Sequence, residues 1–519
     1  MKIKNRIEEL RELKKLCEKG GNQAKTALYH KQGRLTARER INYLLDTGTF
    51  VETNMLLNHL ETAPGDGIVC GHGLIDGRRV CIYSQDSTVM GGSVGPLHGY
   101  KMYKTVERAV EMRVPLIGLH DSPGARLPRI SEKKSVHGDV MEKTGASVFY
   151  PNTSGSGLIP QIAAIMGTCA GLSVYSPALP DFILMVEKQS HMFITGPSMV
   201  KTVTGEDVAH EELGGARVHC EVSGVADARF ANDKECLDKI RELLTFFPAN
   251  CEEKPPVVQM NDDSERLNED LVDIVGFSSR KPYDMHKVIQ SIVDQRQFFE
   301  IKAEFAREVI VGFARMDNET VGIVGNQPTV RAGCLTVDSS DKQTRFMRFC
   351  DCFNIPIILL VDTPAYLPGR IQEHKGIIRH GAKVLYALCE SRVPRIAVVL
   401  RKCYGGGNLA MGVMPGLGTD LVYYWPTVEV GILGAEASAE LYFGSEIAKA
   451  EKPDDVRSQK IKEFEEQYSN PMREISANWG IEDIIEPRHT RTILIKGLKF
   501  LSSKKRNRSS VKHHGNIPM

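Results

Sequence analysis

Apolar residues recur at helical spacing near the start of the chain, with charged residues between them. The first such stripe consists of Ile7, Leu10, Leu13, Leu16 and Cys17. Gly20 and Gly21 follow and are expected to end the helix, and residues 35–46 repeat the pattern. The spacing predicts two amphipathic helices before residue 50.

The pattern changes from about residue 67, where short β-rich apolar runs alternate with glycine turns and helical segments. A helix is expected over residues 98–113, followed directly by a strand over 114–121. Such alternation is typical of an α/β domain. Residues 248–263 are polar and proline-rich, so they are the expected linker. We therefore predict two domains, residues 1–255 and residues 256–519.

The two halves resemble each other in order and spacing. Residues 114–123 match residues 355–364 at an offset of 241, and residues 160–165 match 394–399 at an offset of 234. The second match continues to Gly171 and Gly405. Two segments matched in the same order predict an internal duplication, with one fold in each half.

The repeated segment has a chemical meaning. In each half an apolar run ends in a glycine-containing turn, over residues 162–171 and residues 396–407. If a helix begins there, its first N–H groups have no partner and point outward. Two such groups aimed at one point form an oxyanion hole. A duplicated fold would offer two holes, one for each of two substrates.

Composition narrows the function class. Lys and Arg total 66 against 65 Asp and Glu, which argues against a nucleic-acid-binding protein. No apolar run approaches the roughly 20 residues that a membrane helix needs. The 12 cysteines include no CxxC pair, and no histidine cluster has metal-ligand spacing. We expect a cytoplasmic protein without a metal cofactor.

At several motifs the chain resembles a known family, the carboxyltransferase β subunits of propionyl-CoA and related carboxylases and the α subunits of biotin-dependent decarboxylases. The similarity extends from about residue 30 to the C-terminus. The motifs are residues 84–86, 90–93, 169–178, 192–216, 376–383 and 401–407.

The resemblance implies two tandem crotonase/ClpP-like domains, each a ββα superhelix. It implies carboxyl transfer between biotin on a separate carrier protein and the α-carbon of a coenzyme A thioester, with the N-terminal domain on the acyl-CoA side and the C-terminal domain on the biotin side. The implied assembly is a homohexamer, a trimer of dimers with active sites at the dimer interface. The implied partners are biotin carboxylase and carrier subunits, or a carrier and a membrane decarboxylase subunit.

Site residues follow from the same resemblance. Gly171 and Leu172 match the pair whose N–H groups hold the thioester oxygen, and Gly406 and Gly407 match the pair that holds the biotin carbonyl oxygen. The family usually has a second glycine at position 172. The residues expected around the substrates are Ala170, Tyr175, Arg126, Tyr404 and Leu409.

The chain departs from the family at residues 121–130, where Pro123 replaces a glycine and a Gln-Glu-Gly segment is absent. Ala365 also stands where glycine is common. Leu409 replaces an aspartate near the acyl group, which puts propionyl specificity in doubt. A larger, cyclic or dicarboxylic acyl group is compatible with these changes.

The implied mechanism needs no side-chain nucleophile, because the two oxyanion holes stabilise the charges that develop on the two substrates. His98, His120, His191 and His380 are therefore interpreted as structural. Lys101, like Arg126, could meet a phosphate of coenzyme A.

Three alternatives stay open. A crotonase-type hydratase or isomerase would share the fold but needs a glutamate pair, and no glutamate occurs near residues 169–177. The same carboxyltransferase could run as a decarboxylase in a membrane complex. A non-catalytic scaffold for the biotin carrier is the third. The chain has neither a biotin-attachment motif nor an ATP-grasp domain, so it depends on a carrier for carboxybiotin.

Overall fold

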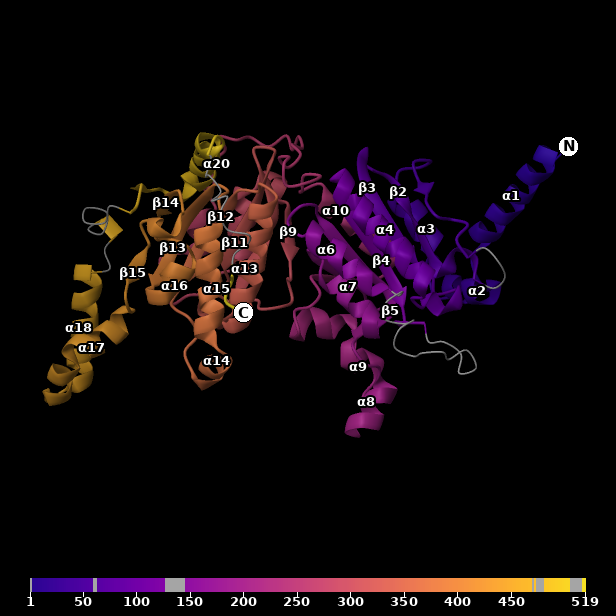
Figure 1. Cartoon of the computed structure of the whole chain (residues 1–519). Helices are drawn as coiled ribbons and strands as arrows, with labels where there is room; N and C mark the ends of the chain where they lie inside the picture. Colours follow the sequence, from indigo (N-terminus) through magenta and orange to yellow (C-terminus); the bar gives the residue numbers. More distant parts are fainter. Residues whose placement is uncertain (1, 59–62, 127–144, 469–470, 473–479, 505–515) are drawn as a thin grey trace. The chain divides into compact units, whose positions relative to one another are not determined.

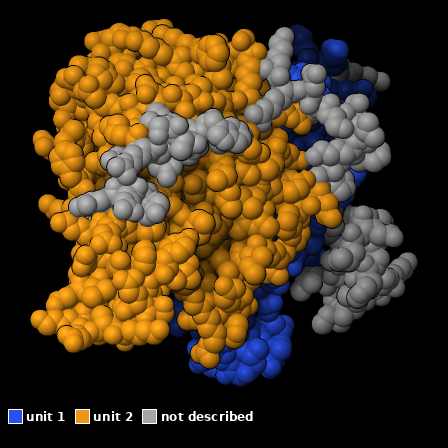
Figure 2. All heavy atoms as spheres, turned by 90° about the vertical axis from the view of Figure 1, so that its left-hand side faces the viewer, with its two compact units in different colours: residues 1–254 blue, residues 255–519 orange. Residues whose placement is uncertain are grey.

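The fold is described from a computed structural model that covers residues 2–58, 63–126, 145–468, 471–472, 480–504 and 516–519. The chain divides into two compact units, residues 1–254 and residues 255–519, which Figure 2 colours blue and orange. The division falls within residues 248–263, which contain no helix or strand.

Three helices precede the first sheet, and Figure 1 shows α1 projecting from the rest of unit 1. Both predicted N-terminal helices are present, as α1 (Lys2–Lys19) and α3 (Ala37–Leu44), with α2 (Gln23–Lys31) between them. Thr36 caps α3 through a reciprocal pair of hydrogen bonds with Glu39.

Unit 1 is built on one eight-stranded sheet in the order β1-β2-β3-β4-β5-β6-β8, with β7 paired to β5. β2 and β3 form an antiparallel pair, and the strands from β3 to β8 pair in parallel. The strands are β1 (Val51–Glu52), β2 (Ile68–Ile75), β3 (Arg78–Gln85), β4 (Leu116–Ser122), β5 (Gln161–Ala170), β6 (Phe182–Val186), β7 (His191–Phe193) and β8 (Ala228–Phe230).

The helix predicted over residues 98–113 is present as α4, which covers nearly all of that range. It packs on β2 and β3 and on α6. The helices of the unit after β3 are α4 (Pro96–Met112), α6 (Phe149–Gly155), α7 (Tyr175–Ala178), α8 (Pro197–Thr204), α9 (His210–Gly214) and α10 (Asp233–Leu244).

Unit 2 repeats this architecture with the sheet order β16-β14-β13-β12-β11-β10-β9, and β15 pairs with β13. The strands are β9 (Phe298–Ile301), β10 (Val309–Met316), β11 (Glu319–Asn326), β12 (Ile357–Thr363), β13 (Arg395–Tyr404), β14 (Leu421–Tyr424), β15 (Glu429–Gly431) and β16 (Asp483–Ile484).

The helices of unit 2 include one antiparallel pair, α17 and α18, that extends away from the sheet (Figure 1). The helices are α11 (Leu271–Val275), α12 (Met285–Ile292), α13 (Val337–Cys352), α14 (Arg370–His374), α15 (Ile377–Glu390), α16 (Gly405–Ala410), α17 (Ala435–Lys449), α18 (Pro453–Tyr468) and α20 (Thr490–Leu501).

The duplication extends to individual buried side chains. Lys101 of α4 donates to the carbonyls of Gly65 and Ile68, and Lys342 of α13, 241 residues later, donates to the carbonyls of the 302–306 loop. The register also shifts at the same place in β4 and in β12. The predicted duplicated α/β architecture is therefore confirmed.

Candidate active site

Each sheet ends its central parallel strand in a tight glycine turn. β5 ends at Ala170, and a short 3-10 helix, η5 (Gly171–Val174), begins at the next residue. β13 ends at Tyr404, and α16 begins at Gly405. Gly171 has φ 59° and Gly405 has φ 49°, which is the left-handed region that favours glycine. A Cβ on Gly405 would also lie 2.8 Å from the Ile432 carbonyl oxygen.

The turns present backbone donors, because the first N–H groups of a helix have no acceptor within it. Gly171 and Leu172 begin η5, and Gly406 and Gly407 lie in the first turn of α16, so none of their N–H groups has an acceptor within its own helix. The local geometry therefore places first-turn N–H groups at both predicted sites, which is the type of donor that an oxyanion hole uses.

The two predicted pairs are not equivalent by position. β5 and β13 match at an offset of 234 residues in their pairing with β4 and β12. Gly171 thus corresponds to Gly405, and Leu172 corresponds to Gly406. The pair Gly406–Gly407 therefore lies one residue farther into its helix than Gly171–Leu172. Leu172 and Gly406 are the only two predicted donors that occupy equivalent positions.

Each turn is supported by the end of the neighbouring strand, but by different contacts. In unit 1 the hydroxyl oxygens of Ser122 and Ser173 lie 3.2 Å apart in a buried hydrogen bond. The equivalent residues in unit 2 are Thr363 and Gly407, where a Cβ on the glycine would lie 2.9 Å from the Thr363 methyl group. Glycine at position 407 thus allows the close approach of strand and turn.

A buried carboxylate stands beside each turn. Asp121 at the end of β4 accepts from Arg34 Nη2 at 2.9 Å and from Arg40 Nη1 at 3.3 Å. Burial raises the pKa of Asp121, and the two arginines oppose that rise. In unit 2, Asp362 accepts from Arg401 Nε at 2.9 Å, and both side chains are fully buried. These carboxylates are paired within the protein, so they support the strands.

Tyr366 is a residue of the site that the sequence interpretation missed. Its ring lies against the second turn, since a Cβ on Gly406 would be 3.2 Å from Tyr366 Cδ2. Its hydroxyl occupies the space that a Cβ on Gly381 of α15 would need, 2.9 Å away. Tyr366 therefore fills the space between α15 and the turn. Gly381 belongs to the motif of residues 376–383, and this glycine was the available signal.

The side chains expected around the substrates lie on or beside the turns. Ala170 and Tyr404 are the last residues of β5 and β13. Tyr175 begins α7, is 47% exposed and packs edge-on against Phe149. Leu409 of α16 is 37% exposed. Tyr404 is buried, and its hydroxyl donates to Glu429 at 2.7 Å.

The two candidate phosphate contacts are engaged inside unit 1. Arg126 donates to the buried Asp66 carboxylate at 2.5 Å and to the Ser93 carbonyl at 2.8 Å. Lys101 is fully buried and bonded to two carbonyls. Arg126 stays a predicted substrate contact, although its guanidinium already has an anionic partner, and Lys101 is structural.

The histidines have structural surroundings. His98 and His120 are fully buried, and burial lowers the pKa of each to about 3. His191 Nε2 lies 2.9 Å from Glu211, and His380 Nδ1 lies 2.9 Å from Asp341. The interpretation of His120 as a core residue is confirmed by its burial.

A small cavity lies directly behind the first turn. The side chain of Leu172 forms part of its wall, together with Phe149 of α6 and Met102 of α4. The remaining lining residues are Gln85, Val94, Val148, Ser173 and Ser176. The replacement of the usual glycine by Leu172 therefore changes the space next to the predicted thioester site.

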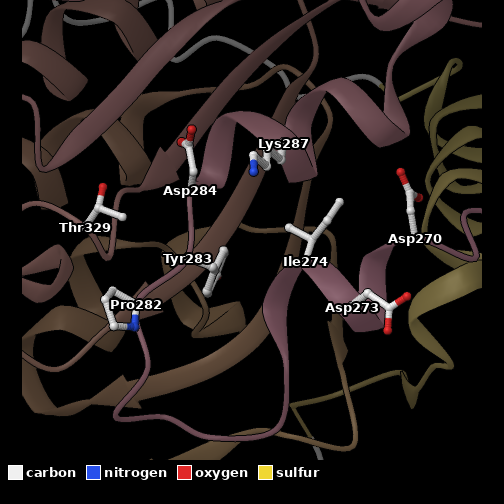
Figure 3. A pocket seen from close by; sticks show the side chains of 8 residues that line it. All are labelled: Asp270, Asp273, Ile274, Pro282, Tyr283, Asp284, Lys287 and Thr329. Carbon is white, nitrogen blue, oxygen red and sulfur yellow. The ribbon is translucent and has the colours of Figure 1, made fainter.

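A larger open pocket lies in unit 2 (Figure 3), and none of its lining residues belongs to the glycine turn of that unit. Its lining residues are Asp270, Asp273, Ile274, Pro282, Tyr283, Asp284, Lys287 and Thr329. Asp284 is already bonded to His286 and Gln327. None of the predicted site residues lines this pocket.

Within the described ranges, no group of three or more His, Cys, Asp or Glu side chains is arranged to hold a metal ion. None of the described helices is long and apolar enough to cross a membrane. Of the departures at residues 121–130, residues 127–130 lie outside the described part of the chain. Pro123 and Ala365 follow the ends of β4 and β12.

Comparison with known proteins agrees with these features. Residues 28–517 match the model of a family described as "Carboxyl transferase domain". The chain is 45% identical to the carboxyltransferase subunit of propionyl-CoA carboxylase from Haloferax mediterranei, with all of both chains covered. It is 44% identical to the α subunit of methylmalonyl-CoA decarboxylase from Veillonella parvula, over 100% of this chain and 99% of that protein.

Among solved structures, the chain is similar to transcarboxylase 12S, with a TM-score of 0.92 and 43% identity over 99% of this chain and 98% of that one. That structure is described as a hexamer assembly with methylmalonyl-coenzyme A and methylmalonic acid bound. The similarity confirms the expected fold of two tandem crotonase-like domains.

Proposed function

The chain belongs to the carboxyl transferase family and is a carboxyltransferase of the acyl-CoA carboxylase type, and from this premise we propose that it moves a carboxyl group between biotin on a carrier protein and the α-carbon of an acyl-CoA. The observation that carries the proposal is the pair of glycine turns, one in each unit, at which a helix begins with N–H groups that have no acceptor within that helix.

The unit 1 turn is the proposed acyl-CoA site. In the overall exchange the carboxyl group replaces the α-proton, and that proton ends on the ureido nitrogen of biotin. The N–H groups of Gly171 and Leu172 donate to the thioester oxygen, onto which negative charge moves during this exchange. A fixed N–H donor is worth about 2.7–4 kcal/mol of barrier reduction in other oxyanion holes. Because such donors are already oriented, they need no reorganisation during the reaction.

The unit 2 turn is the proposed biotin site. Biotin, when bound, supplies the carboxyl group and a ureido oxygen on which negative charge develops. The N–H groups of Gly406 and Gly407 suit that oxygen because they lie in the first turn of α16 and have no acceptor within that helix. The Tyr366 ring holds the turn in place, and Tyr404 and Leu409 flank it.

The proposed assembly is a homohexamer that receives biotin from a separate carrier subunit. The transcarboxylase 12S relative is described as a hexamer, and the similarity spans nearly the whole chain. The carrier belongs either to a biotin carboxylase complex or to a decarboxylase complex, since relatives of both kinds match equally well. Light scattering should then give six times the 57.6 kDa chain mass.

The hydratase alternative lacks support at the unit 1 turn. No carboxylate lines the cavity beside Gly171 and Leu172 in the part of the chain that the structure describes. A hydratase needs acid and base groups at the acyl site, whereas carboxyl transfer needs donors to two oxygens.

The test is transfer of labelled carboxyl from carboxylated acyl-CoAs to free biotin by the purified chain. The panel is malonyl-, methylmalonyl-, glutaconyl- and 3-methylglutaconyl-CoA. Transfer from at least one of them is expected. Absence of transfer from all four, together with hydration of an enoyl-CoA, would reject the carboxyltransferase proposal.

A further inference from the structure

Leu172 occupies a position with two different consequences for a substrate. Its backbone N–H is one of the proposed donors to the thioester oxygen, and its side chain lines the cavity behind the turn. An acyl chain whose thioester oxygen is held by that N–H therefore begins within one side-chain length of the cavity.

The cavity presents hydrocarbon rather than free polar groups. Val94, Met102 and Val148 are buried in its wall. Its polar lining residues are already bonded, because Ser173 pairs with Ser122 and Ser176 donates to Asn152 at 3.1 Å. The amide oxygen of Gln85 accepts from the Asp121 N–H at 3.1 Å. A carboxylate would find no unpaired donor among these residues, whereas an alkyl group would be desolvated.

The cavity is also small. It leaves room for at most about one water-sized group. Leu172 and Phe149 are its half-buried lining side chains, while the other lining residues are buried. These two side chains therefore determine how far an alkyl chain can extend behind the turn.

We propose that Leu172 is a specificity-determining residue that limits the acyl group to a short, unbranched, apolar chain, with Phe149 forming the opposite wall. This inference rests on the proposed carboxyltransferase function. Leucine in place of the usual glycine at position 172 keeps the backbone N–H that donates to the thioester oxygen. Its side chain reduces the cavity that would receive the acyl chain.

The test compares label transfer to free biotin from methylmalonyl-, ethylmalonyl- and butylmalonyl-CoA, which carry alkyl groups of increasing length. The full-length wild-type chain should prefer methylmalonyl-CoA. Leu172→Ala keeps the N–H and enlarges the cavity, so the kcat/KM ratio of ethylmalonyl- to methylmalonyl-CoA should rise at least about 10-fold, as for one methylene in other apolar pockets.

Phe149→Ala enlarges the same cavity from the other side and should shift the ratio in the same direction. Ile194→Ala is the matched control, because this exposed residue lies near the Gly171 turn but does not line the cavity. An unchanged ratio in Leu172→Ala and Phe149→Ala, or an equal rise in Ile194→Ala, overturns the role of Leu172. Failure of the wild type with all three, alongside transfer from glutaconyl- or 3-methylglutaconyl-CoA, overturns the proposed acyl preference. Failure with those two as well overturns the carboxyltransferase proposal instead.

Discussion

Gly167 of β5 and Arg401 of β13 occupy equivalent positions in the two units. Each lies beside a buried aspartate at the end of the neighbouring strand, but Gly167 only leaves room for it, whereas Arg401 pairs with it. A Cβ on Gly167 would overlap the Asp121 carboxylate, which is neutralised by Arg34 and Arg40 from the N-terminal region. In unit 2 the strand itself supplies the cation, because Arg401 pairs with Asp362. The duplicated fold thus keeps one charge-balanced site beside each turn with different partners.

Arg401→Met should destabilise unit 2 strongly. It would leave the buried Asp362 with only the more distant Lys402, whose Nζ lies 3.9 Å away. Breaking a buried pair costs about 3–5 kcal/mol. The double variant Arg401→Met/Asp362→Asn removes the charge as well and should recover much of that stability. Hydrogen exchange of β12 and β13 peptides measures the effect within unit 2. Equal protection in the wild type and the single variant contradicts this prediction.

Gly405→Ala should be more damaging than Gly171→Ala. Both force alanine into the left-handed region, which costs about 1–2 kcal/mol. Only Gly405 also brings the new Cβ within 2.8 Å of a carbonyl oxygen, since the nearest atom at Gly171 is 4.0 Å away. The difference should appear in thermal unfolding and in the rate of label transfer. A larger loss in Gly171→Ala would show that the turns are not equivalent as described.

Tyr366→Ala should weaken the biotin half of the reaction selectively. Loss of the ring leaves Gly406 without its neighbour, so the KM for free biotin should rise while the KM for the acyl-CoA stays constant. Tyr366→Phe keeps the ring and removes only the hydroxyl, whose neighbour is Ser340 of α13. It should therefore retain activity. Equal losses in both variants would mean that the hydroxyl, and not the ring, is required.

His286 should make the stability of unit 2 depend on pH. Its ring nitrogens lie 2.8 Å from Asp284 and 2.9 Å from Glu300, and the hydrogen bond to Glu300 is the main cause that raises the pKa of His286. Because the folded pKa lies above the unfolded value, the stabilisation is complete below about pH 6.5. It is lost as the pH rises through the raised pKa.

The measurement is denaturant unfolding of the wild type and His286→Gln from pH 5.5 to 8.5. Asp284 and Glu300 face the ring directly, and Gln327 and Arg307 lie beside them. The variant removes only the titratable ring and leaves these four side chains in the sequence. The stability difference between the two proteins should shrink as the pH rises. A constant difference across this range would contradict a charged His286.

The sequence alone was sufficient for the features that depend on local order. Periodicity placed the helices near Ile7 and Leu44, because an apolar stripe marks the helical period. The stripe of α3 is buried at Ile41 and Leu44, whereas Ile7 in α1 is 43% exposed. The repeat at offsets of 241 and 234 residues predicted two copies of one α/β fold. The same repeat located both turns, since the left-handed backbone at Gly171 and Gly405 requires glycine whatever surrounds it.

Only the tertiary structure decided which partners meet across long stretches of sequence. No local pattern shows that Asp121 is neutralised by Arg34 and Arg40, 87 and 81 residues earlier. The contact of Tyr366 with Gly406 and the cavity behind Leu172 likewise depend on side chains from separate elements. Periodicity records which face of an element is buried, but not what it is buried against, because that depends on how the strands pair and how the helices pack on them.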